Sequence, residues 1–138
     1  MIDPRSARRL ARYRRWADQL TFDAVAALPP GEATKQRPTL FKTMIGTLNH
    51  SYLIDLVWQA QPEGRDRGLE ARNLVLHQGL SAERDEPGGI LVHVVNHATY
   101  HRGWIAEMFF QVPARSPATD RPDYLRGLEL APGRNDGS

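Results

Sequence analysis

Apolar residues recur at helical spacing along several separate stretches of the chain. A stripe that repeats every three to four residues lets one face of a helix pack against a core. The pattern predicts helices over residues 6–28, 39–60, 69–80, 90–111 and 123–128. The stretch over 69–80 has few apolar anchors, so the third helix is expected to be short. The predicted fold class is therefore all-α.

The ends of these helices are marked by capping and helix-breaking residues. Ser6 is a candidate N-cap for the first helix, because its hydroxyl can accept a hydrogen bond from a backbone N–H of the first turn. The sequence Pro29–Gly31 ends that helix, and Pro87–Gly89 separates the third helix from the fourth. These breaks predict helices joined by loops within one unit.

The composition is that of one globular domain: the 138 residues are 41% hydrophobic and 25% charged. We assign residues 1–130 to this domain and expect residues 131–138 to form a disordered tail. No apolar run approaches the ~18 residues that a membrane-spanning helix needs. The basic N-terminus is not followed by the apolar segment of a signal peptide. With no cysteine in the chain, we expect a cytoplasmic protein without a membrane partner.

The first predicted helix is rich in arginine. The residues concerned are Arg5, Arg8, Arg9, Arg12, Arg14 and Arg15. One interpretation is nucleic-acid binding, with Tyr13 and Trp16 available to stack on bases. The other is a solvated helix face, since the apolar stripe of Leu10, Tyr13 and Ala17 lies apart from most of the arginines. We favour the solvated face, and nucleic acid is not an expected partner.

Three histidines follow one another at intervals of four residues in the stretch 90–111. His97 and His101 would lie one above the other on a helix and could bind one metal ion. An HxxxH pair is a weak signal alone, but its flanks are apolar, and buried imidazoles need partners. His50, on the other strongly apolar helix, is the expected third ligand. His93 is one turn away and is expected to be a pocket wall or to support the site.

The ligand set indicates which metal and which chemistry to expect. Three neutral imidazoles without thiolate or carboxylate favour zinc or nickel. Three protein ligands leave a position for water or substrate, as in catalytic sites. Ala98 follows His97 where an HExxH site has glutamate, so no catalytic base is assigned. Asp55 could pair with Arg102, orient a ligand histidine, or be a partly exposed carboxylate.

Four segments carry a resemblance to a known family. They are YRRWAD (13–18), GTLNHSYLIDLVW (46–58), HVVNHATYHRG (93–103) and PATDRPDYLR (117–126). With these segments the chain resembles the DinB/YfiT-like family of metal-binding four-helix bundles. The resemblance implies a four-helix bundle, here with an abbreviated third helix. It also implies that His50, His97 and His101 are the ligands of a divalent metal.

The resemblance implies a range of activities as well. Relatives include thiol-dependent S-transferases and a mycothiol-dependent maleylpyruvate isomerase, in which the metal would activate a low-molecular-weight thiol. The leading hypothesis is a metal-dependent transferase acting on a small thiol, with a water-activating hydrolase as the second reaction type. The alternative is a non-catalytic, damage-inducible metal-binding module. The family usually has glutamine where this chain has Trp104, which we place at the pocket mouth.

The short third helix also bears on assembly. The second and fourth predicted helices are apolar over wide arcs that include Ile54, Phe109 and Phe110. An abbreviated third helix would leave part of this surface exposed, and large apolar patches are rare on monomers. We therefore expect a homodimer.

Overall fold

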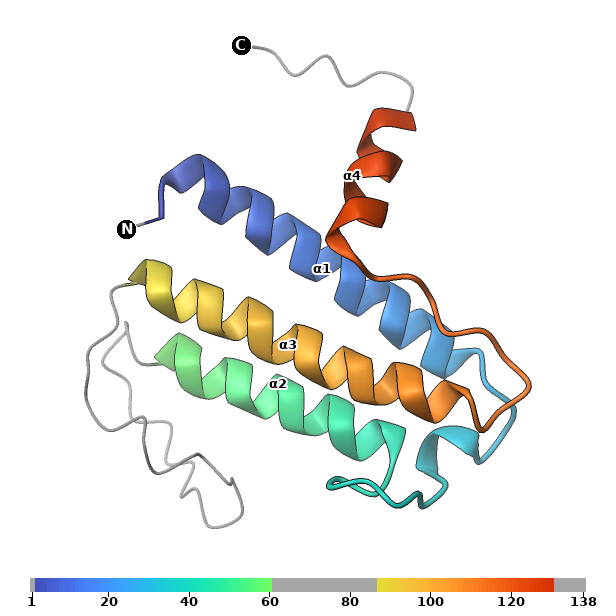
Figure 1. Cartoon of the computed structure of the whole chain (residues 1–138). Coiled ribbons are helices and arrows are strands. Elements are labelled where there is room, and N and C mark those ends of the chain that lie inside the picture. Colours follow the sequence, from blue (N-terminus) through green and yellow to red (C-terminus); the bar gives the residue numbers. More distant parts are fainter. Residues whose placement is uncertain (1, 61–86, 131–138) are drawn as a thin grey trace.

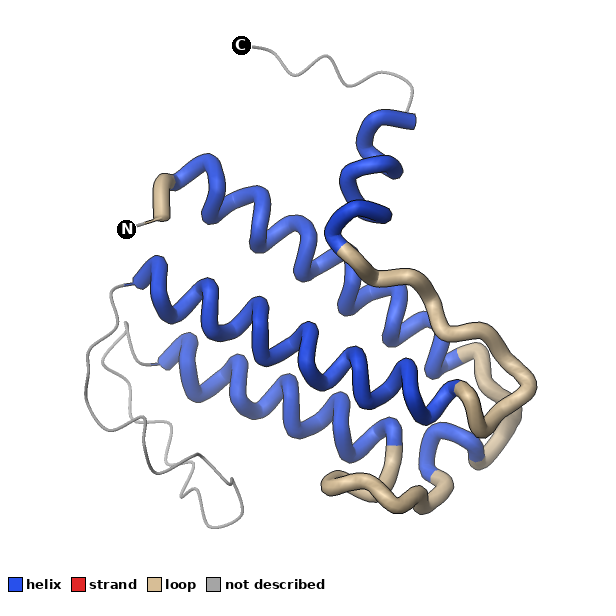
Figure 2. The backbone as a smooth tube through the Cα atoms, viewed as in Figure 1, coloured by secondary structure: helices blue, strands red, loops and turns tan. Residues whose placement is uncertain are grey.

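The computed structural model describes residues 2–60 and 87–130, and over these residues it contains helices and no strand. The helices are α1 (Pro4–Ala26), α2 (Met44–Ala60), α3 (Pro87–Phe109) and α4 (Arg121–Leu130), with a short 3-10 helix, η1 (Glu32–Thr34). Figure 2 shows loops that join α1 to η1, η1 to α2, and α3 to α4. The predicted all-α, four-helix class is confirmed. None of these helices is apolar over a length that would cross a membrane.

Three long helices lie side by side, with α3 between α1 and α2 (Figure 1). The α3 helix packs against both neighbours, whereas α4 packs against α1. In Figure 1, α4 runs across the direction of the three long helices and extends away from them. The central position of α3 means that its side chains can contact residues of α1 and α2 at once.

The core consists of two groups of buried side chains. One group joins α1, α2 and α3 and contains Val25, Met44, Leu48, Ile105, Met108 and Phe109. The other joins α1 and α3 through Tyr13, Ala17 and Val95, and Trp16 and Tyr124 pack against it. Burying apolar side chains of this size contributes about 1.5–3 kcal/mol each. The predicted apolar stripe of α1 is thus the side that packs inward.

The start of α1 differs from the prediction. Asp3, not Ser6, is the N-cap: its carboxylate accepts hydrogen bonds from the backbone N–H groups of Arg5 (2.9 Å) and Ser6 (3.0 Å). Pro4 occupies the first helical position, where its fixed φ suits the helix and its missing N–H costs nothing. The helix therefore begins before Ser6.

The other helix boundaries also shift. The α2 helix begins at Met44, later than predicted, because residues 37–43 form a turn in which the Arg37 N–H bonds to the Lys42 carbonyl at 2.6 Å. Lys42 has a positive φ of 61°, which is incompatible with a continuing helix. The α4 helix extends to both sides of the predicted turn over 123–128. The predicted short third helix over 69–80 and the tail over 131–138 lie outside the described residues.

Candidate metal centre

Three histidines from two helices meet between α2 and α3. His50 projects from α2, while His97 and His101 occupy successive turns of α3. One ring nitrogen from each lies within 4.8 Å of the other two. The Nε2 atoms of His97 and His101 are 3.0 Å apart. The structure therefore brings together the three residues predicted as ligands, and this group could hold a metal ion.

Aromatic side chains enclose the three rings. Phe41 stacks on His50 with ring centroids 4.1 Å apart and planes 20° apart. Trp104 meets the His101 ring edge-on at 4.9 Å and 85°. Trp104 thus contacts one of the three histidines. Phe41 was missed by the sequence reasoning, which treated it as the start of a helix. Predicting that Phe41 lies at the site would have required the conformation of the turn before α2.

Gly46 explains how Phe41 comes so close. A Cβ atom at position 46 would lie 2.4 Å from the Phe41 carbonyl oxygen, a separation that real side chains do not adopt. Glycine at this position therefore lets the backbone at Phe41 fold onto the first turn of α2. The same contact carries the Phe41 ring over His50. Gly46, the first residue of the segment 46–58 that resembles the family, thus helps to place Phe41 at the site.

His93 lies beside the site without belonging to the three-nitrogen group. Its ring stacks on His97 with centroids 5.9 Å apart and planes 20° apart. It is half-buried. Its ring thus lies next to the three histidines, and its role as a wall residue stays a prediction.

Burial lowers the basicity of the cluster. Desolvation, followed by the proximity of other histidines, lowers the pKa of His97 and of His101 to about 4. Desolvation also lowers the pKa of His50. At neutral pH the rings are therefore uncharged, and a neutral imidazole has a lone pair available for a metal ion.

The Nε2 atoms of His97 and His101 face each other at 3.0 Å, so a ligand shared by the two rings would bind through these atoms. The Nδ1 atoms of both rings are buried and have no hydrogen-bond partner among the described residues. An unsatisfied buried polar atom costs about 1–3 kcal/mol. Together, three nitrogen donors without a carboxylate or thiolate are the donor set that a borderline divalent ion prefers. The residues present thus fit the metal implied by the sequence.

The lowered pKa values predict how the stability of the metal-free protein depends on pH. Between pH 6.5 and about pH 4 the unfolded chain binds protons at His97 and His101, and the folded chain does not. The free energy of unfolding should therefore fall as the pH falls through this window. Urea unfolding at a series of pH values measures it. A His97→Gln/His101→Gln double variant should lose less stability over the same window. An equal loss in both proteins would contradict the assignment.

The predicted pairing of Arg102 with Asp55 is wrong. Arg102 donates to the Asp18 carboxylate at 2.7 Å and to the Thr99 hydroxyl at 2.8 Å. Asp55 pairs instead with Arg14 of α1, which also bonds to Asp18 at 3.3 Å. The reason is that α1 supplies an acidic side chain, Asp18, and a basic side chain, Arg14, which lie close to Arg102 and Asp55. The sequence alone could not place these two side chains there.

These four charges form a chain that joins three helices. The order is Asp55 on α2, Arg14 and Asp18 on α1, and Arg102 on α3. Burial raises the pKa of Asp55, and Arg14 opposes that effect. Arg102 also lies 5.7 Å from the centre of the Tyr13 ring. Each charge has an opposite charge beside it, so the chain links the three helices next to the histidines.

A small cavity connects this charged chain to the histidine cluster. It has a volume of about 120 Å³ and lies between α1, α2 and α3. Asp18, Asp55, His101 and Arg102 contribute to its lining, with apolar residues such as Leu48 and Ile105. Asp55 thus lines the same cavity as His101, and its carboxylate accepts a hydrogen bond from Arg14.

Comparison with known proteins agrees with the residues at this site. The model of the DinB family matches residues 1–81 and 81–133. Protein DinB of Bacillus subtilis (strain 168) is 27% identical over 158 residues, covering 85% of this chain and 92% of the relative. No solved structure matches the chain. The family matches span nearly the whole sequence, including all three histidines and the segments on which the resemblance rested, so the chain belongs to the DinB family.

Proposed function

We propose that His50, His97 and His101 bind one divalent ion, zinc or nickel, and that the protein is a metal-dependent enzyme acting on a small thiol or on water. The observation that carries this proposal is the convergence of three ring nitrogens within 4.8 Å of one another. The lowered pKa values support it, because the ligands need not lose protons near neutral pH. A bound ion would act as a Lewis acid that lowers the pKa of a thiol or water.

The residues around the histidines would position a substrate and limit water. His101 is only 4% exposed, whereas His50 and His97 are half-buried, so the cluster is reached from the side of His50 and His97. Phe41 and Trp104 cover the rings with apolar surface. Such surface lowers the local dielectric and strengthens the electrostatic effect of a bound cation. The aromatic walls suit a ligand with a polarisable sulfur atom.

A non-catalytic metal-binding module is the second candidate. It is favoured because the carboxylates near the cluster already pair with arginines. Asp55 is engaged by Arg14, and Asp18 is engaged by Arg14 and Arg102. Glu107 is exposed on α3. Without a free carboxylate among the described residues next to the histidines, general-base catalysis would depend on the substrate or on solvent.

Metal analysis followed by thiol-transfer assays distinguishes these functions. The purified protein, without a metal-binding tag, is examined for zinc and nickel by mass spectrometry. The metal-loaded and chelator-treated forms are then assayed with several low-molecular-weight thiols and one electrophile. Turnover that requires the metal supports the transferase. Bound metal without turnover of thiol or hydrolysable esters supports the binding module. Failure to retain or rebind either metal would overturn both.

We also propose that the protein is a homodimer. Ile54 and Phe109, expected on the exposed arcs, are buried within the protomer, but Phe110 is 86% exposed. We expect a dimer at micromolar concentration, with more than ~1,000 Å² of buried surface that includes Phe110. Sedimentation equilibrium should therefore show that Phe110→Glu shifts the protein toward monomer, because a charge in an apolar interface is costly. Leu130→Glu, an exposed site at the end of α4, is the control. A monomeric wild-type protein would contradict the proposal.

A further inference from the structure

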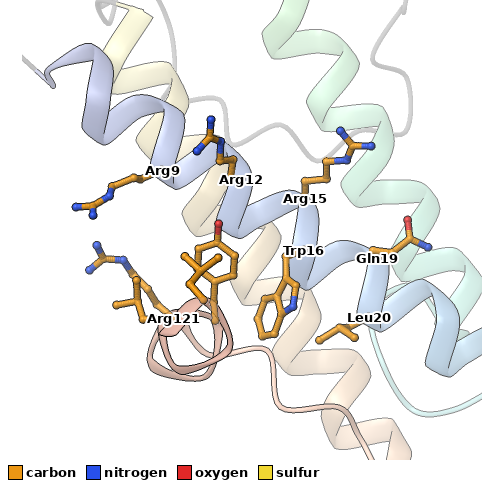
Figure 3. Close-up of a pocket in the computed structure, with 10 residues that line it drawn as sticks. Arg9, Arg12, Arg15, Trp16, Gln19, Leu20 and Arg121 are labelled. Atoms are coloured by element: carbon orange, nitrogen blue, oxygen red, sulfur yellow. The ribbon is translucent and has the colours of Figure 1, made fainter. Parts of the chain in front are cut away.

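A second, larger cavity lies between α1 and α4, away from the three histidines (Figure 3). Its volume is about 870 Å³, within the ~300–1,000 Å³ range of small-molecule sites. Among the described residues, its lining comes from these two helices: Arg9, Arg12, Arg15, Trp16, Gln19, Leu20, Arg121, Tyr124, Leu125 and Leu128. We call this cavity the α1–α4 groove.

The charged residues that the structure describes around the groove are all of one sign. Four arginines line it, and no acidic residue of the described part of the chain does. In Figure 3 the side chains of Arg9 and Arg121 approach the same side of the opening from opposite helices. All four arginines are exposed. Like charges gathered in a concave surface produce a positive potential that attracts anions.

These arginines also lack ion-pair partners in the described part of the chain. None of the four makes an ion pair with a residue that the structure describes, whereas Arg14 on the same helix pairs with Asp18 and Asp55. On α4, the carboxylate of Asp123 is engaged by Arg126. A solvated helix face, the interpretation favoured from sequence, explains exposed arginines on α1. It does not explain why an arginine of α4 joins them across a groove.

The floor of the groove is apolar and partly aromatic. Trp16 and Tyr124 are half-buried, with ring centroids 5.3 Å apart and planes 50° apart. Leu20, Leu125 and Leu128, also half-buried, complete the floor. In Figure 3 the Trp16 and Leu20 side chains extend from α1 toward α4. A ligand that fits would combine negative charge with an apolar body.

We propose that the α1–α4 groove binds a small organic phosphate, with its phosphate held by the arginines and its apolar body on the Trp16–Tyr124 floor. Arginine guanidinium groups bind phosphate through paired, charge-assisted hydrogen bonds. Aromatic floors stack on planar groups such as nucleobases. A nucleic-acid strand is a poorer fit, because Tyr13, the other aromatic residue of α1 that could stack on successive bases, is buried. A lipid headgroup offers the same phosphate chemistry and is distinguished by experiment.

Calorimetric titration of the metal-free full-length chain tests this proposal. The probes are adenosine diphosphate, inorganic phosphate, a single-stranded oligonucleotide, and vesicles containing phosphatidylglycerol. We expect one adenosine diphosphate per chain. Arg9→Gln/Arg121→Gln should weaken its binding at least about tenfold, since each lost charge-assisted bond contributes more than a neutral one. Leu125→Gln should weaken the nucleotide but not inorganic phosphate. His97→Ala should bind the nucleotide like the wild type.

The matched control is Arg8→Gln/Arg115→Gln, which removes the same charge from exposed positions outside the groove. It should weaken nucleotide binding less than about threefold, because only distant electrostatics changes. An equal loss in both double variants would overturn the proposal, as would equal affinities for nucleotide and inorganic phosphate. The proposal also fails if no nucleotide binds at millimolar concentration. Much tighter, Arg9-dependent binding of the oligonucleotide or the vesicles would assign the groove to that partner instead. Circular dichroism confirms that each variant is folded.

Discussion

Replacing His97 with alanine is expected to reduce the affinity for Zn²⁺ by more than about 100-fold, because even the loss of an outer partner of a ligand costs ~10–100-fold. His97 is the middle residue of the cluster: its Nε2 lies 3.0 Å from that of His101, and its ring centroid lies 5.4 Å from that of His50. Without His97, α3 has no two histidines four residues apart. Competition with a chromophoric chelator near neutral pH measures the change.

His93→Ala is the matched control for this experiment. It removes an imidazole from the same helix, one turn away, whose ring stacks on His97 but does not join the three-nitrogen group. Its effect should stay below about tenfold, at the lower end of the range for outer partners. Equal losses for the two variants would mean that general packing controls the affinity. Unchanged affinity in His97→Ala would exclude the proposed ligand set.

Replacing Arg102 with methionine is expected to lower the free energy of unfolding by about 1.5–3 kcal/mol, the range for hydrogen bonds to charged groups. Arg102 is 6% exposed and donates to Asp18, Thr99 and, at 3.4 Å, the Tyr13 hydroxyl. Its loss removes a donor from three acceptors between α1 and α3 and leaves Asp18 paired with Arg14. Urea unfolding of the metal-free protein at neutral pH measures the effect.

A second pair of variants keeps this prediction testable if Arg102→Met fails to fold. Asp18→Asn retains the shape of the side chain and should destabilise by a smaller amount in the same direction. Arg126→Met removes an arginine from the exposed pair with Asp123 and should cost less than about 1 kcal/mol, as surface ion pairs do. Similar effects for Arg102→Met and Arg126→Met would show that the buried chain of charges contributes no more than a surface pair.

The fold class and the meeting of the three histidines could be predicted because both depend on local patterns. The spacing of His97 and His101 places them on one face of any helix. His50 lies on a helix whose apolar residues had to pack against the same core. The family resemblance, now confirmed by the comparisons, supplied the pairing of the two helices.

The partners of the charged residues could not be predicted, because they depend on how helices distant in the sequence pack together. From the sequence alone, Asp55 and Arg102 were candidates to pair with each other. The structure places Arg14 and Asp18 of α1 between them. The α1–α4 groove was hidden for the same reason, since Arg121 joins the arginines of α1 only once α4 crosses that helix. The N-cap at Asp3 is different, because the neighbouring Pro4, a residue typical of the first helical position, indicates it in the sequence.

The division of the three imidazoles between two helices makes metal affinity and helix docking linked quantities. The α3 helix supplies two nitrogens by itself, but the third arrives only when α2 is docked. The apparent affinity therefore equals the intrinsic affinity multiplied by the fraction of docked molecules. By thermodynamic reciprocity, an ion that binds the docked form more tightly shifts the equilibrium toward docking. Met44→Ala, a substitution in the core that changes no ligand, would therefore weaken metal binding once an appreciable fraction of the molecules is undocked. Added metal would then recover the docked population.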